Sequence, residues 1–137
     1  MLSRQGRTRS ANVIFEFPHL GGHRHMKTQD AVQDVIGAFK GANLVALGDR
    51  HWAREDSEFR LKLIRHPAFA QAVTDVVIEF ANPLHQDLLD RYVNGEPVLP
   101  TELRKIWQDT TQPGAWDSPV YEDFLHAVRE VNRLAGG

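Results

Sequence analysis

Two short apolar runs in the middle of the chain each lead into charged residues. The run 43–48 is followed by Asp49 and His51, and the run within 74–80 leads to Glu79. Short continuous apolar runs are typical of buried parallel strands, so both are predicted to be strands. In open α/β sheets ligands bind beyond the carboxyl ends of the strands. We therefore expect Asp49, His51 and Glu79 to meet at one edge of a sheet.

Helical periodicity surrounds the two runs. Helices are predicted, from apolar residues recurring every three to four positions, at 28–41, 55–66, 83–94, 101–108 and 117–134. Pro67 is expected to end the second of them. The order strand, helix, strand predicts a right-handed βαβ unit. The expected fold class is α/β, with a small, mainly parallel sheet of two or three strands and flanking helices, completed by oligomerisation.

The first 25 residues differ in composition from the rest. Arginines are scattered among small polar residues, and 13–17 is predicted to be a short strand. No apolar stretch of about 7 to 15 residues marks a secretory signal, so a cytoplasmic location is expected. Residues 1–25 are interpreted as a leader, and 26–137 as a single α/β domain.

Composition excludes several classes of function. The formal net charge of −2 provides no general field for nucleic acid, so nucleic-acid binding is not expected. No apolar run approaches the roughly 20 residues that span a bilayer. Without cysteine, the chain has no thiol nucleophile, and any metal must be bound by histidines and carboxylates.

The predicted strand ends carry candidate chemistry. Adjacent strands lie about 4.8 Å apart, so Asp49, His51 and Glu79 can share one ion or one water. Such a set binds a divalent metal or acts as a general base oriented by a carboxylate. The alternative interpretation is structural: Asp49 caps a turn, and Glu79 forms an ion pair with Arg50.

Four segments of the chain resemble the erythromycin esterase and ChaN-like superfamily, to which TIKI metalloproteases are also similar: 47–51 (LGDRH), 77–80 (VIEF), 86–95 and 116–132. Members typically carry Gly-Glu-x-His after the first strand and Glu at the end of the next. His51 and Glu79 match this pattern, whereas Asp49 stands where the family has Glu. The resemblance covers only the N-terminal half of the family fold, which implies open sheet edges and a homodimer.

Further residues are candidates for the same site. His23 and His25 alternate, so an extended backbone would place both imidazoles on one side as metal ligands. His85 is predicted in the first turn of a helix at the functional edge, and Trp52, next to His51, is a candidate wall of an apolar pocket.

The sequence thus predicts a hydrolase of small-molecule ester or phosphoester substrates. Water is activated by His51 with Asp49 and Glu79, around a divalent metal such as zinc or manganese. Arg50 is expected to stabilise the developing oxyanion. The alternative, implied by the ChaN-like resemblance, is a haem- or metal-binding protein without turnover.

Overall fold

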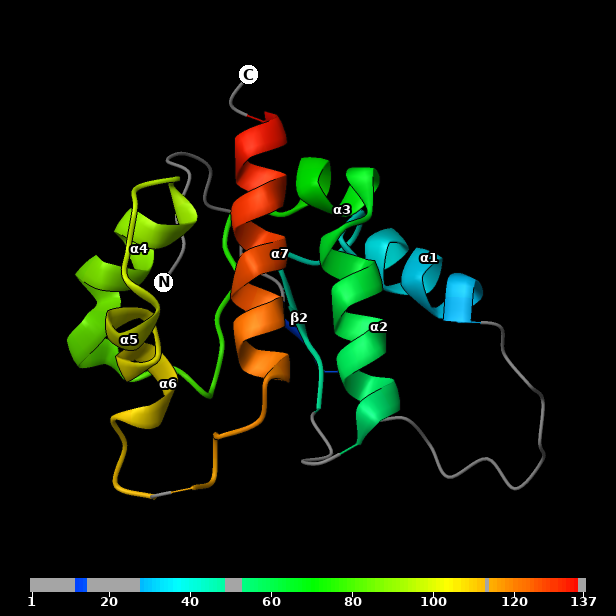
Figure 1. Cartoon of the computed structure of the whole chain (residues 1–137). Helices are drawn as coiled ribbons and strands as arrows, with labels where there is room; N and C mark the ends of the chain where they lie inside the picture. Colours follow the sequence, from blue (N-terminus) through cyan, green and yellow to red (C-terminus); the bar gives the residue numbers. More distant parts are fainter. Residues whose placement is uncertain (1–11, 15–27, 49–52, 113, 136–137) are drawn as a thin grey trace. The chain divides into compact units, whose positions relative to one another are not determined.

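The computed structural model describes residues 12–14, 28–48, 53–112 and 114–135 (Figure 1). The elements, in chain order, are β1 (Asn12–Ile14), α1 (Thr28–Ala38), β2 (Leu44–Ala46), α2 (Arg54–Ile64), α3 (Pro67–Ala72), the 3₁₀ turn η1 (Pro83–His85), α4 (Gln86–Val93), α5 (Pro100–Leu103), α6 (Lys105–Gln108) and α7 (Val120–Ala135). The chain divides into two compact units, with the boundary between Val73 and Thr74. Among the described residues, no helix combines the length and apolar character needed to cross a bilayer.

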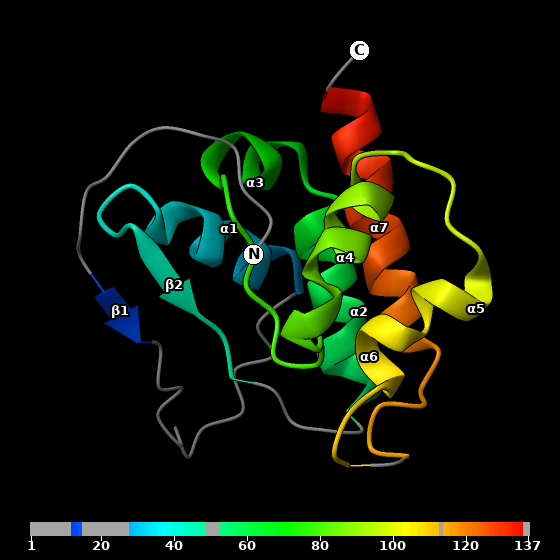
Figure 2. The same cartoon turned by 90° about the vertical axis from the view of Figure 1, so that its left-hand side faces the viewer.

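The first unit combines α1, α2 and α3 with a two-stranded parallel pair. β1 and β2 lie side by side (Figure 2). In the register of this pair, Val13 is opposite Val45. The three helices contact one another, and the rings of Phe39 and Phe69 meet edge to face at 6.1 Å. The side chains buried in this unit are Val32, Val35, Ala42, Leu63, Ile64 and Phe69.

A proline opens a helix in this unit instead of only ending one. α2 ends at Ile64, and Pro67 then occupies the first turn of α3, where its missing N–H removes no helical hydrogen bond. The His66 Nδ1 accepts a hydrogen bond from the Ala68 backbone N–H at 3.2 Å, and Gln33 Nε2 lies 3.0 Å from its Nε2. Pro67 was expected to end a helix, and the structure adds that it starts the next one.

The second unit is built on the contact of α4 with α7. Its buried side chains are Phe80, Leu89, Tyr92, Val93, Leu103, Ile106, Trp107, Tyr121, Phe124, Leu125, Ala127 and Val128. The Phe80 ring lies 4.7 Å from the Tyr121 ring and 5.8 Å from the Phe124 ring, between centroids. This aromatic cluster packs the segment that precedes α4 against α7. Aromatic pairs contribute stabilising free energy beyond that of the apolar area they bury.

The predicted α/β fold is wrong. The described chain is mostly helical, and its regular strands are the three-residue partners β1 and β2. Within 74–80 only Val76 makes an isolated bridge, and Val77 is 79% exposed. A run of three apolar residues does not distinguish a strand from a connecting segment, and here it forms no regular strand. Oligomerisation was expected to complete a sheet of this kind, and this expectation is wrong for the same reason.

Helices occupy the predicted segments, but two of the predicted helices are divided. The predicted helix 83–94 is η1 followed by α4, which ends at Val93; Gly95 follows with a φ of +98° that favours glycine. The predicted helix 101–108 is two short helices, α5 and α6. In α7, Phe124 and Val128 are buried, as the helical spacing predicts.

Candidate functional site

The structure describes two of the residues that the sequence assigns to a site. Glu79 lies exposed in the segment before η1, and His85 is the last residue of η1. The remaining site predictions lie outside the described residues: His23, His25, Asp49, Arg50, His51 and Trp52. The cluster of His51, Asp49 and Glu79 therefore stays a prediction.

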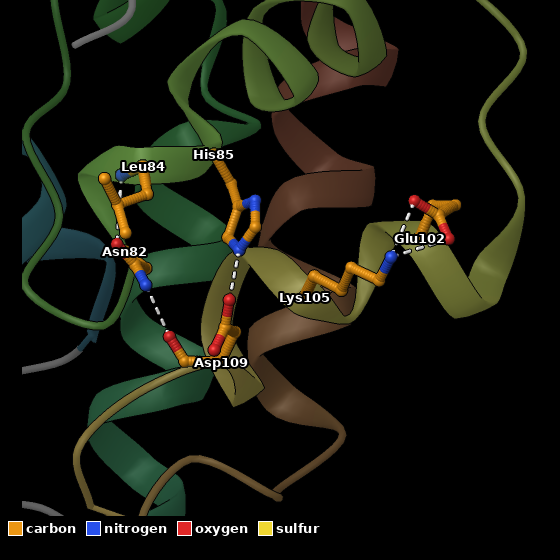
Figure 3. Close-up of polar contacts among 6 residues, drawn as sticks. All are labelled: Asn82, Leu84, His85, Glu102, Lys105 and Asp109. Carbon is orange, nitrogen blue, oxygen red and sulfur yellow. Dashed lines mark hydrogen bonds and ion pairs between the residues drawn. The ribbon is translucent and has the colours of Figure 1, made fainter.

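His85 is hydrogen-bonded to a carboxylate that the sequence did not identify. Its Nε2 lies 2.7 Å from Oδ2 of Asp109, which follows α6 (Figure 3). The His85 side chain is 21% exposed and the Asp109 side chain 62% exposed. The imidazole is therefore mostly buried, while its carboxylate partner faces water.

Asn82 frames this pair from the start of η1. Its Oδ1 accepts the backbone N–H of Leu84 at 2.9 Å, the N-cap geometry, and Pro83 occupies the first position of the turn. Its Nδ2 donates to the backbone carbonyl of Asp109. The site is thus built from one capped turn and the end of one helix.

The geometry defines the roles of the two ring nitrogens. An ionised carboxylate only accepts hydrogen bonds, so in the neutral ring Nε2 carries the proton and Nδ1 is the acceptor. No hydrogen bond from a described residue reaches Nδ1 of His85. An imidazole oriented by a carboxylate, with its other nitrogen unprotonated, is the arrangement of a general base.

An ion pair between Lys105 and Glu102 is drawn next to the His85–Asp109 contact in Figure 3. Lys105 Nζ contacts both carboxylate oxygens of Glu102, at 2.9 and 3.0 Å. Both side chains are about half exposed, so the pair adds little to stability. The Glu102 carboxylate therefore neutralises the positive charge of Lys105 on α6.

The metal prediction is not tested by the structure, because of its predicted ligands only Glu79 is among the described residues. In these segments no group of three or more histidines and carboxylates is placed to hold an ion. A carboxylate on one ring nitrogen, as at His85, is the outer-shell pattern of a metal-bound histidine, but a site needs further ligands. A metal centre would therefore depend on residues outside the described segments, such as His51.

Another polar chain joins α4 to α7. The Tyr92 hydroxyl is hydrogen-bonded to Nδ1 of His126, and Nε2 of His126 lies 3.7 Å from Oε1 of Glu122. Arg104 Nε lies 3.5 Å from the other oxygen of Glu122. The Tyr92 ring is only 5% exposed. This chain of contacts connects α4, α7 and Arg104, which lies between α5 and α6.

Arg129 completes that contact by binding the end of α4. Its guanidinium lies 4.7 Å from the centre of the Tyr92 ring and donates to the carbonyls of Tyr92, Gly95 (2.7 Å) and Glu96 (2.8 Å). Asn132 Nδ2 donates to the carbonyl of Val93 at 3.1 Å. Carbonyls at a helix C-terminus have no partner within the helix, so these side chains cap α4 from α7.

Burial raises the pKa of the Tyr92 hydroxyl above its ordinary value of 10.0; the Arg129 charge opposes this, and Glu122 and Glu130 add to it. The unfolded chain therefore releases this proton first, so stability is unaffected below about pH 10 and falls as the pH rises towards the folded-state pKa. We expect the urea midpoint to be unchanged up to about pH 9 and to fall as the pH rises above about 10, with a smaller fall in Tyr92→Phe. Tyr121→Phe is the matched control, and an equal drop in Tyr92→Phe and the wild type would contradict the expectation.

Sequence reasoning selected His85 but missed its partner. Asp109 is 24 residues away in a loop, and no spacing rule connects the two. Asn82 carried a usable signal, because Asn before Pro is a common start of a turn or helix.

Comparison with known proteins provides no relative: no family model, curated protein or solved structure matches the chain. The resemblance of 43–132 to the erythromycin esterase and ChaN-like superfamily therefore stays a prediction.

Proposed function

We propose that this chain hydrolyses small-molecule ester or phosphoester bonds, with His85 as the general base and Asp109 as the residue that orients it. The observation that carries the proposal is the 2.7 Å contact between His85 Nε2 and Asp109 Oδ2, made by an imidazole that is mostly buried. A neutral ring held at one nitrogen by a carboxylate has one favoured tautomer and one favoured orientation. General-base catalysis requires both.

The proton path follows from this geometry. Nδ1 of His85 takes a proton from the attacking water, and the imidazolium that forms is stabilised by the Asp109 carboxylate at Nε2. The same proton is then available for the leaving group. Water serves as the nucleophile, and no covalent intermediate is required.

The sequence assigns the same chemistry to His51 with Asp49 and Glu79. That assignment remains a prediction, as do the roles of Arg50, Trp52, His23 and His25. A bound divalent metal, the haem-binding alternative, a homodimer and a cytoplasmic location are predictions in the same sense. The two histidines can be compared directly in one experiment.

Turnover of a panel of aryl ester and aryl phosphoester substrates is the test. We expect His85→Ala and Asp109→Asn each to lower kcat by about 100-fold, because each removes an oriented base. His66→Asn is the matched control, because Asn is also a favoured N-cap for α3 and the variant should keep wild-type rates.

The outcomes separate the two assignments. Loss of turnover in His85→Ala, with His66→Asn unaffected, supports the proposal. Loss in His51→Ala together with full activity in His85→Ala would overturn it and favour the cluster predicted from the sequence. Absence of turnover of every substrate in the panel would also count against it.

A further inference from the structure

Asn82 forms hydrogen bonds with the backbone next to both members of the His85–Asp109 pair. On the side of His85, its carbonyl accepts the His85 backbone N–H at 3.0 Å and its Oδ1 accepts that of Leu84 at 2.9 Å. On the side of Asp109, its backbone N–H donates to the Ile106 carbonyl at 2.7 Å and its Nδ2 donates to the Asp109 carbonyl. The two partners are 24 residues apart in sequence, yet one residue binds the backbone on both sides.

Exposure explains why such a link matters. The Asp109 side chain is 62% exposed, and an ion pair with water access is worth little and is easily lost to solvent. Asp109 is the C-cap of α6, and its own backbone N–H donates to the Lys105 carbonyl at 3.3 Å. The hydrogen bond from Asn82 Nδ2 to the Asp109 carbonyl adds a restraint from outside α6. This restraint helps to keep the Asp109 carboxylate next to the His85 ring.

We propose that Asn82 is a positioning residue, whose side-chain amide holds the Asp109 backbone so that the Asp109 carboxylate stays on Nε2 of His85. Its effect on turnover depends on the function proposed above, whereas its effect on the ion pair does not. Asn82 itself touches no reacting atom. It acts by fixing the geometry that a general base needs before the substrate binds.

Two substitutions separate the two roles of the Asn82 side chain. Asn82→Ser keeps an N-cap oxygen for Leu84 but removes the amide donor to Asp109, whereas Asn82→Ala removes both. Asn132→Ser is the matched control, because it removes another asparagine amide bonded to a backbone carbonyl, that of Val93, at the end of α4.

The first readout is the Nε2–H proton resonance of His85 in ¹⁵N-labelled protein at a pH where the ring is neutral. We expect it in the wild type and in Asn132→Ser, and we expect its loss in Asn82→Ser and Asp109→Asn, all with unchanged far-UV circular dichroism. The second is kinetics: Asn82→Ser should lower kcat by about 10-fold to 100-fold with KM unchanged.

The two readouts test the positioning role of Asn82 and the base role of His85 separately. If the resonance persists in Asn82→Ser, or is missing from the wild type, the positioning role is overturned, whatever the activity. If the resonance is lost in Asn82→Ser while kcat is unchanged, the positioning role stands and the base assignment of His85 fails. Loss of the resonance together with reduced kcat supports both.

Discussion

Trp107→Ala is expected to lower the free energy of unfolding by about 3–5 kcal/mol, the range for removing a buried aromatic side chain. Trp107 is only 2% exposed, and it lies on α6 next to the fully buried Ile106. The substitution removes the transfer free energy of the indole and leaves a cavity that the short helices around it cannot close. Urea unfolding followed by circular dichroism measures the loss.

Trp116→Ala is the matched control for the tryptophan prediction. Trp116 is half-buried in the loop before α7, where its ring meets Tyr121 at 5.5 Å. A smaller loss is expected there, because less area returns to water. If Trp116→Ala destabilised the chain as much as Trp107→Ala, the placement of the core around α6 would be wrong.

Arg129→Ala is expected to lower the free energy of unfolding by about 3 kcal/mol. Hydrogen bonds to a charged group contribute about 1.5–3 kcal/mol each, and contributions within one cluster are not additive. The guanidinium binds three carbonyls at the end of α4 and covers the Tyr92 ring, so its loss removes three charged hydrogen bonds and the packing on that ring together. Chemical denaturation is again the measurement.

Two further variants sharpen the arginine prediction. Arg129→Lys keeps the charge but lacks the planar fork that reaches several carbonyls at once, so it should recover only part of the stability. Arg133→Ala removes an exposed arginine one turn later on α7 and should change little. Equal losses in Arg129→Ala and Arg133→Ala would show that charge alone, without the cap, is responsible.

Helices were predictable from the sequence because their signals are local. Phe124 and Val128 recur at the helical spacing, and Gly95 marks a helix end with a conformation that other residues adopt poorly. The strand predicted at 74–80 does not form, because a strand depends on a partner elsewhere in the chain, which an apolar run alone does not reveal. Its apolar run indicates burial, yet Val77 is exposed.

The candidate site was predictable only in part, for the same reason. His85 could be selected from its place at the start of a helix. Its partner Asp109 comes from a loop after α6, and the residue that joins them, Asn82, acts through backbone atoms. Contacts of this kind follow from the packing of α4 and α6 around buried side chains, which sequence spacing does not encode.

The short length of α4 sets the order in which the site can form. A helix of eight residues has no stability of its own in water, and α4 is held at its C-terminus by Arg129 and Asn132. Both belong to α7, the last helix described. During synthesis, the turn that carries His85 therefore emerges well before the helix that stabilises its continuation. The imidazole and its carboxylate are therefore expected to reach their final geometry only after α7 has been synthesised and has packed against α4.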